Sequence, residues 1–116
     1  NILSGRDAVF TVMLHVDVAS ELASLPPTVR AKMIRLIDKL KINATALREP
    51  DSKPLGAGLF EIRTMGTEPG RGLYVYQKGK TIYLLRVFIK KTQKTPKQEM
   101  MLAFERLEEM LNEQKN

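Results

Sequence analysis

The chain has 116 residues, 43% of them apolar and 28% charged, with 19 lysines and arginines against 13 acidic residues. It has no cysteine and one histidine, which excludes disulfide frameworks, thiol catalysis and the usual Cys/His metal sites. A chain of this length builds one core, so we expect a single domain over residues 1–116. No apolar run approaches the roughly 18 residues that cross a bilayer, and no secretion signal is visible, which favours a cytoplasmic protein. Residues 1–7 lack an initiator Met, and we expect them to be disordered or left by trimming.

The first part of the chain predicts a strand followed by two helices. Apolar and polar residues alternate over residues 9–16, as in a half-buried strand. The apolar members share one predicted face: Phe10, Val12, Leu14 and Val16. Asp17 then opens a short helical stretch, which Pro26 and Pro27 separate from a second helix. That second helix carries a buried stripe at helical spacing: Val29, Met33, Leu36, Ile37 and Leu40.

Residues 43–58 hold two prolines and two glycines without a sustained period, so a long loop is expected there. Three strands are predicted after it, over residues 59–64, 73–77 and 81–90, with a hairpin turn at 77–80. Thr95 and Pro96 then open a final, acidic helix, with Thr95 as its N-cap.

This order of elements predicts an α+β fold. We expect an antiparallel sheet with the N-terminal helical hairpin packed on one face. The other face is expected to be free for a ligand and lined by Tyr74, Tyr76 and Tyr83.

The positive charge is concentrated in one segment. Between Pro69 and Gln98 there are eight basic residues and no acid, whereas the rest of the chain has a small acidic excess. A block of this kind predicts a polyanionic partner. A Lys-rich solvent surface is the alternative, and binding to a membrane surface is disfavoured because most of these residues lie in strand-like sequence.

Several of these cations are predicted to converge where the strands end. Arg63 lies on the polar face of its strand, Arg71 precedes the next strand, and Arg86 interrupts the apolar run of the third. Lys90, Lys91 and Lys94 follow at the exit of that strand. Guanidinium groups bind phosphate bidentately, and a lysine crowded by other cations has a lowered pKa. Such a set suits RNA binding, and it suits RNA cleavage through the 2′-OH without a metal.

Each of these residues also has a purely structural interpretation. Arg63 and Glu61 are neighbours on one face of a strand and can simply join surface ion pairs. Arg86 favours a functional role, because an unpaired cation among apolar residues is costly. His15 is far in sequence from the basic block, and we interpret it as structural.

Three segments together resemble the RelE/HigB superfamily of bacterial toxins, in particular its phage-derived, HigB-like branch. They are Lys53-Pro-Leu-Gly-Ala-Gly-Leu-Phe-Glu-Ile-Arg63, Arg71 before Leu73-Tyr74, and Leu84-Leu-Arg-Val-Phe-Ile-Lys-Lys-Thr-Gln-Lys-Thr-Pro96. The resemblance extends from about Asp17 to Glu109. The chain departs from it at Arg86, where this branch commonly has a histidine, and at Gly72, where an apolar residue is usual.

The resemblance implies a microbial-RNase-like sheet and a toxin that cleaves mRNA on the ribosome, with no metal and no cofactor. It implies two partners, a cognate antitoxin of helix-turn-helix type and the mRNA-bearing ribosome, and no membrane. The expected catalytic residues are Arg63, Arg71, Arg86, Lys90 and Lys91. The expected RNA-binding residues are Lys78, Lys80, Lys94 and Lys97.

One alternative from another class is a non-catalytic protein that only binds RNA or its antitoxin. DNA binding is the weaker alternative, because no predicted helix is basic enough to enter a major groove.

Overall fold

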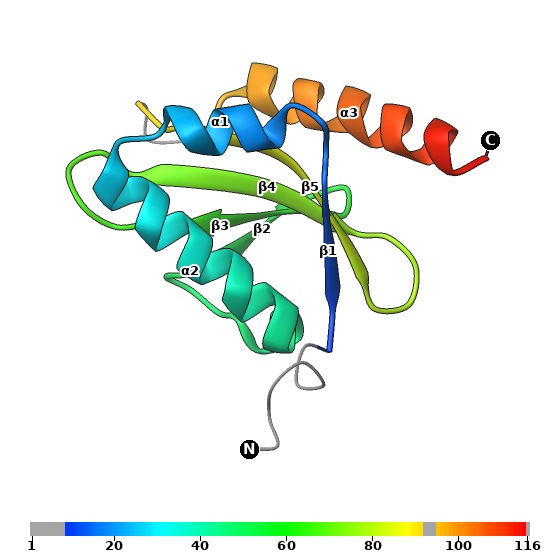
Figure 1. The fold of residues 1–116 in the computed structure, drawn as a ribbon, viewed down its shortest axis with the longest axis horizontal. Coiled ribbons are helices and arrows are strands. Elements are labelled where there is room, and N and C mark those ends of the chain that lie inside the picture. The colour runs from blue at the N-terminus through cyan, green and yellow to red at the C-terminus, as the bar shows by residue number, and fades with distance from the viewer. Residues whose placement is uncertain (1–8, 92–94, 116) are drawn as a thin grey trace.

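The computed structural model describes residues 9–91 and 95–115, and it has the predicted α+β class (Figure 1). The elements in chain order are β1 (Thr11–Leu14), α1 (Val18–Ser24), α2 (Pro27–Asn43), the 3₁₀ turn η2 (Ala44–Ala46), β2 (Ser52–Gly56), β3 (Leu59–Arg63), β4 (Gly70–Tyr76), β5 (Thr81–Ile89) and α3 (Lys97–Lys115). In the described parts of the chain, no helix is long and apolar enough to cross a membrane.

The five strands form one sheet in the order β1-β5-β4-β3-β2. The expected purely antiparallel sheet is wrong at one pair, because β1 runs parallel to β5, with Thr11 opposite Thr81 and Leu14 opposite Leu84. All other neighbouring strands are antiparallel. Alternation of apolar side chains indicates a strand but not its direction, so the sequence pattern did not distinguish the two arrangements.

The long loop expected over residues 43–58 contains η2 and the edge strand β2. Pro54 and a register shift between Pro54 and Gly56 remove the regular alternation by which a strand is recognised. Proline and bulges are tolerated at a sheet edge because one side of the strand needs no partner.

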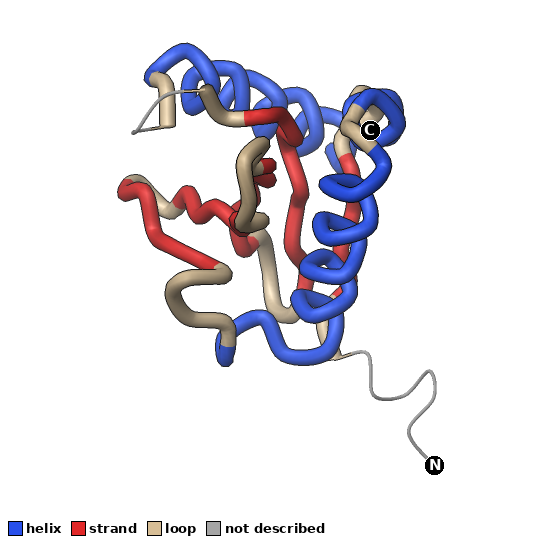
Figure 2. Tube along the Cα trace, turned by 90° about the vertical axis from the view of Figure 1, so that its left-hand side faces the viewer, coloured by secondary structure: helices blue, strands red, loops and turns tan. Residues whose placement is uncertain are grey.

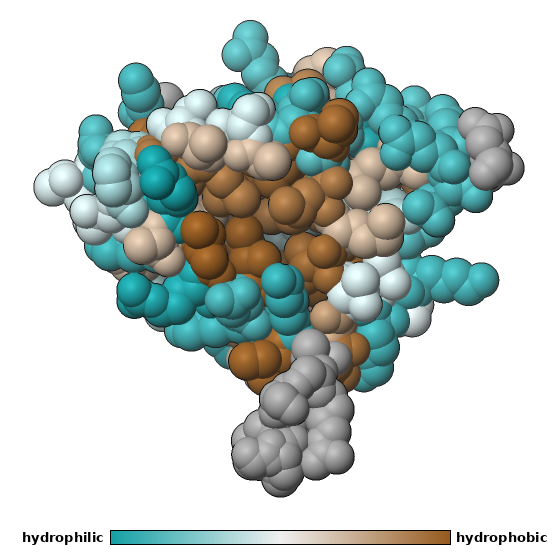
Figure 3. Space-filling view, in the orientation of Figure 1, coloured by the Kyte–Doolittle hydropathy of each residue, from teal (hydrophilic) through white to brown (hydrophobic). Residues whose placement is uncertain are grey.

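Helices cover both faces of the sheet (Figure 2), and a hydrophobic cluster lies on each face. The first joins α1 and α2 to the sheet, and it includes Met33, Leu40, Ile62 and Leu84. In Figure 3, apolar atoms of this face gather between α1, α2 and β1, within a ring of hydrophilic residues. The close approach of α2 requires glycine in β4, because a Cβ at Gly70 would lie 2.8 Å from Val29 Cγ1.

The second cluster places α3 over the other face of the sheet, with Ala103 and Met110 against Leu73 and Leu85. That face is therefore not free along its whole length, which corrects the expectation. Tyr74 and Tyr83 do not line an open surface either, because Tyr74 is buried in the first cluster and Tyr83 in the second.

The first strand also differs from its expected pattern. Phe10 and Val12 contact the first cluster, but Leu14 is 42% and Val16 80% exposed, whereas His15 is buried. The reason is that the chain leaves the sheet after Leu14 and turns into α1, so the alternation no longer sets which side chains face the core.

Candidate functional site

Basic side chains from three strands share the end of the α3-covered face. Arg63 of β3 lies directly opposite Arg71 of β4, so their side chains leave the same face of the sheet. Glu61 lies two residues before Arg63 and therefore on that face, and Lys53 of β2 is its register partner. Together with Lys90 and Thr95, which line one pocket with Glu61, these residues form what we call the Glu61 cluster. Its members are Lys53, Glu61, Arg63, Arg71, Lys90 and Thr95.

Glu61 is the only carboxylate of this cluster, and it is 2% exposed. Its Oε1 lies 3.5 Å from Nε of Arg71, and its Oε2 accepts a hydrogen bond from the hydroxyl of Thr95. Arg71 also donates from Nη1 to the carbonyl oxygen of Gly70 at 3.0 Å. A buried carboxylate held in this way fixes the guanidinium of Arg71 at the surface of the sheet.

Among the residues that the structure describes, two arginine nitrogens in the cluster have no hydrogen-bond partner, although one of them lies within ion-pair distance of Glu61. They are the buried Nε atoms of Arg63 and Arg71. Unpaired buried donors are rare in proteins, and here they show that the cluster contains more donors than acceptors.

The electrostatics of the cluster destabilise its positive charges. Burial lowers the pKa of Arg71, and the neighbouring Arg63 lowers it further, while Glu61 opposes both effects. The pKa of Lys90 is lowered by burial and then by Arg71, with Arg63 and Lys53 acting in the same direction and Glu61 against it. A cluster whose cations repel each other gains stability when an anion binds between them.

A pocket of about 270 Å³ opens beside these groups, between β2, Lys90 and the start of α3. Glu61, Lys90, Thr95 and Lys53 line it, together with apolar side chains that include Met100. The combination of guanidinium groups, a lysine and a partly apolar wall suits a phosphodiester and its attached base.

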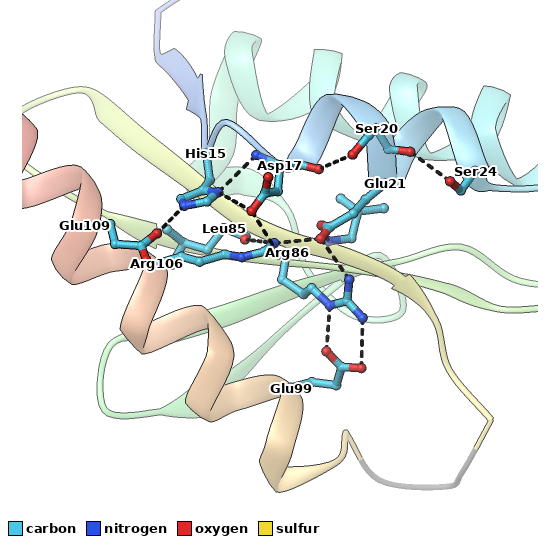
Figure 4. Close-up of polar contacts among 11 residues, drawn as sticks. His15, Asp17, Ser20, Glu21, Ser24, Leu85, Arg86, Glu99, Arg106 and Glu109 are labelled. Atoms are coloured by element: carbon cyan, nitrogen blue, oxygen red, sulfur yellow. Dashed lines mark hydrogen bonds and ion pairs between the residues drawn. The ribbon is translucent and has the colours of Figure 1, made fainter.

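Arg86 lies in a different environment, shown in Figure 4. Its Nε and Nη2 donate to the two carboxylate oxygens of Glu99 at 2.6 and 3.1 Å, and its Nη1 donates to Glu21 at 2.9 Å. The hydrogen bonds to Glu99 raise the pKa of Arg86 above its usual value. The expectation that Arg86 is an unpaired cation is therefore wrong, because two carboxylates neutralise it.

These pairs belong to a larger network that joins α3 to α1 and β5. Arg106 of α3 lies 2.8 Å from Glu21 and donates to the carbonyl oxygen of Leu85. The other carboxylate oxygen of Glu21 accepts from the backbone N–H of Val87, and His15 Nε2 lies 2.6 Å from Glu109. We call this the Arg86 network, and its members are His15, Asp17, Glu21, Arg86, Glu99, Arg106 and Glu109. The network supplies hydrogen-bond partners for backbone groups of β5 beyond the end of β1, namely the N–H of Val87 and the carbonyl oxygen of Leu85. This is a structural role.

The structure brings only some of the predicted residues together. Arg63, Arg71 and Lys90 belong to the Glu61 cluster, and Lys91 is exposed next to Lys90. Lys97 is the exposed first residue of α3. Lys78 and Lys80 lie in the β4–β5 turn, at the other end of β4 from Arg71, where Lys80 Nζ is 5.0 Å from the centre of the Phe10 ring. Lys94 lies outside the described residues.

Sequence reasoning missed the position of three members of the cluster. For Glu61 the structural alternative was a surface ion pair, but Glu61 is buried and its ion-pair partner is Arg71. The hydroxyl of Thr95, which was expected only as the N-cap of the final helix, donates to Glu61, and Lys53 fell in the expected loop. The one available signal was the spacing Glu61-Ile62-Arg63, which places both charged residues on one face.

Within residues 9–91 and 95–115, no group of three or more His, Cys, Asp or Glu is arranged to hold a metal ion.

Comparison with known proteins identifies the family and the fold. Residues 20–108 match the family described as phage-derived protein Gp49-like. No curated protein sequence matches the chain. Among solved structures, the toxin–antitoxin complex RelBE2 from Mycobacterium tuberculosis is 27% identical, with a TM-score of 0.53 over 70% of this chain and 98% of that chain.

Two further structures have the same fold at lower identity. Free Escherichia coli toxin RelE, with two arginines changed to alanine, gives a TM-score of 0.64 at 13% identity over 84% of this chain and 97% of that one. The archaeal RelE–RelB complex from Pyrococcus horikoshii gives a TM-score of 0.54 at 24% identity over 70% and 94%. By these matches, the chain belongs to the phage-derived Gp49-like family and to the RelE superfamily of toxins.

Proposed function

We propose that this toxin is a metal-independent endoribonuclease that cleaves mRNA on the ribosome and so stops translation. The observation that carries the proposal is the Glu61 cluster, in which Arg63, Arg71 and Lys90 meet around one carboxylate with two buried arginine donors unpaired. Unlike the Arg86 network, this cluster has more cations than carboxylates and has a pocket beside it. The resemblance of the chain to RelE toxins points in the same direction.

The reaction that fits the cluster uses the 2′-OH of the RNA as nucleophile. The 2′-oxygen attacks the adjacent phosphorus and loses its proton to solvent, and the bond from phosphorus to the 5′-oxygen breaks. The products are a 2′,3′-cyclic phosphate and a free 5′-OH. Arg71 and Arg63 would neutralise the charge that develops on the phosphorane, which is the largest contribution that fixed donors make to such a step. Because the guanidinium of Arg71 is already held by Glu61 and by the Gly70 carbonyl, little reorganisation is needed.

Lys90 is the best candidate for the proton donor to the departing 5′-oxygen. Its pKa is lowered by burial and by Arg71, so its ammonium group gives up a proton more readily than an ordinary lysine. Lys91 and Lys97 would hold the flanking RNA, as would Lys94, Lys78 and Lys80 where the substrate reaches them. Arg86 is left out of the catalytic set because its donors are taken by Glu21 and Glu99.

The proposed partners are the ribosome with its mRNA and an antitoxin. Two of the similar structures are complexes with an antitoxin, RelBE2 and RelE–RelB. A protein that cleaves mRNA needs such an inhibitor in the cell that makes it, and we propose one of helix-turn-helix type. The proposal also places the protein in the cytoplasm, where translation occurs.

Inducible expression in bacteria tests the proposal, with growth measured and cuts in a reporter mRNA mapped by primer extension. Growth arrest with codon-phased cuts is expected from the original chain and not from Arg71→Ala. Arg48→Ala is a matched control, because Arg48 is exposed and bonds only to backbone carbonyls of its own loop. A folded protein that causes neither arrest nor cuts would overturn the proposal and favour a role in binding alone.

A further inference from the structure

A second basic cluster comes from α2, outside the basic segment of the sequence. Lys32, Arg35 and Lys39 are separated by three and four residues, so they lie on one side of the helix. In the sequence they look like the solvent face of an amphipathic helix. In the structure, this face of α2 lies next to the end of β3.

The pocket between them has a volume of about 220 Å³. The cations Lys32, Arg35, Lys39 and Arg63 line it, together with Asp51 and Thr64. Arg63 thus belongs both to this pocket and to the Glu61 cluster, where it lies opposite Arg71. We call this space the α2 pocket.

The charges of the α2 pocket are not balanced by the protein. Its one carboxylate, Asp51, lies 3.5 Å from Nζ of Lys39. Lys32 donates to the carbonyl oxygen of Met65 at 3.1 Å, a neutral partner. Among the described residues, no carboxylate lies within 4 Å of the charged groups of Lys32, Arg35 or Arg63. Like charges at this helical spacing repel and destabilise a helix, so the arrangement costs stability in the free protein.

We propose that the α2 pocket binds a phosphate group of the RNA strand, next to the phosphate that is cleaved. This inference rests on the proposed function, since it takes the Glu61 cluster as the cleavage site. The α2 pocket and the Glu61 cluster lie on opposite faces of the sheet, and both include Arg63, at the end of β3. This is the reason for choosing RNA over an isolated anion, because a strand that passes over this end of the sheet brings phosphates to both sites. Arginine and lysine are the side chains that bind phosphates of nucleic acids, without reading the base sequence.

A phosphate bound in the α2 pocket sets a requirement on the substrate. The RNA must continue past the scissile bond on the side of α2. Binding is therefore expected to depend on salt through Lys32, Arg35 and Lys39 as well as through the Glu61 cluster.

The test is binding of a single-stranded 2′-O-methyl RNA oligonucleotide, which cannot be cleaved through its 2′-oxygen. Affinity is measured by fluorescence anisotropy over a series of KCl concentrations for the full chain and two double variants. Arg35→Gln/Lys39→Gln removes two cations of the pocket. Lys41→Gln/Arg48→Gln removes one lysine and one arginine that do not line it, and Lys41 is paired with Asp38 as Lys39 is with Asp51. Circular dichroism checks that both variants are folded.

The pocket variant is expected to bind about tenfold more weakly, and its salt slope to fall by about 0.7 for each phosphate that it no longer neutralises. The control variant is expected to keep both the affinity and the slope of the original chain. Equal affinity and slope for the two double variants would overturn the inference, as would failure of the original chain to bind the oligonucleotide at low salt.

The experiments distinguish failure of the phosphate site from failure of the proposed mRNA cleavage. If the original chain makes no cuts in mRNA but its RNA affinity still depends on Arg35 and Lys39, the proposed cleavage is wrong and the phosphate site stands. If it makes codon-phased cuts but the pocket variant binds and cuts as the control does, the phosphate site is wrong and the proposed cleavage stands.

Discussion

The Glu61 cluster and the Arg86 network both hold arginines on or beside the same sheet, but they differ in how their charges are matched. The Arg86 network sets Arg86, Arg106 and His15 against four carboxylates, and all three nitrogens of the Arg86 guanidinium donate to a carboxylate. The Glu61 cluster sets four cations against Glu61 alone. In the first region the protein completes its own ion pairs, and in the second it leaves cations for which a ligand must provide the counter-charge.

An arginine within an apolar strand is therefore a poor indicator of function by itself. Arg86 and Arg71 are both partly or fully buried in strands, and both have a glutamate as neighbour. What separates them is the number of donors that remain unpaired, which depends on residues distant in sequence. Variants in the two regions test this difference, beginning with the largest expected effect.

Arg71→Ala should lower the rate of mRNA cleavage by about 10³-fold, because it removes a fixed donor to the phosphorane. The measurement is the cleavage rate in a purified translation reaction. The double variant Arg71→Ala/Glu61→Gln serves as control, since it avoids leaving a buried, unpaired carboxylate. Cleavage by the folded double variant at the original rate would show that the Glu61 cluster is not the site.

Lys90→Arg should lower the rate by about 10²-fold and change its pH dependence. A proton donor must be protonated, so the original rate should fall as pH rises through the pKa of Lys90. Because burial and Arg71 lower that pKa, the fall should begin at a lower pH than for an ordinary lysine. Arginine stays protonated throughout, so the variant should lack this limb, and a pH–rate series of both proteins decides it. If the cleavage rate of the variant still falls at high pH, the proton donor is a group other than Lys90.

Arg86→Ala should act on stability more than on chemistry. It leaves Glu21 and Glu99 without their shared counter-ion, and because these side chains are partly exposed we expect the free energy of unfolding to fall by about 2 kcal/mol. The measurement is urea unfolding, with cleavage rates expressed per folded molecule, which should fall less than tenfold. Loss of cleavage without loss of stability would return Arg86 to the catalytic set.

Thr95→Val should have the smallest effect. It removes the hydroxyl that donates to Glu61 and should cost about 1 kcal/mol in the free energy of unfolding. A modest loss of cleavage should accompany it, as Glu61 then holds Arg71 less firmly. Thr81→Val, at a half-buried position in β5 away from the cluster, is the comparison variant. An equal loss of cleavage in both variants would mean that the Thr95–Glu61 bond does not position Arg71.

Regular apolar spacing allowed the helices and most strands to be predicted, since periods of 3.6 and 2 follow from geometry. Periodicity did not predict the strands correctly where glycine or proline interrupts the apolar pattern. Strand β4 begins at Gly70 rather than at the predicted Leu73, and this start was missed because Gly70 and Gly72 contribute no apolar pattern. Glycine is required at Gly70 because α2 packs too closely there for a Cβ. Strand β2 was hidden by Pro54, which only an edge strand accepts.

The site was predictable in part for a related reason. Strand alternation brings Arg63 to the face of the sheet, and the position of Lys90 follows from the end of β5. The partner of each charge was not predictable, because Glu99 reaches Arg86 from α3 and Thr95 reaches Glu61 from beyond β5. The α2 pocket was hidden for the same reason, since Asp51 and Arg63 come from segments that the sequence separates from α2.

The parallel pairing of β1 with β5 determines when the molecule can be assembled. Thr11 of β1 pairs with Thr81 of β5. Strand β1 is synthesised first, but it can join the sheet only after β5, the last strand, has been synthesised. Contacts between positions so far apart in sequence slow folding. Until β5 forms, the apolar stripe of α2 has an incomplete surface to cover, and the chain is most exposed to aggregation in that interval. The full α2-covered core is therefore a late product of folding, whereas the pairing of Arg63 with Arg71 lies within neighbouring strands and does not depend on β1.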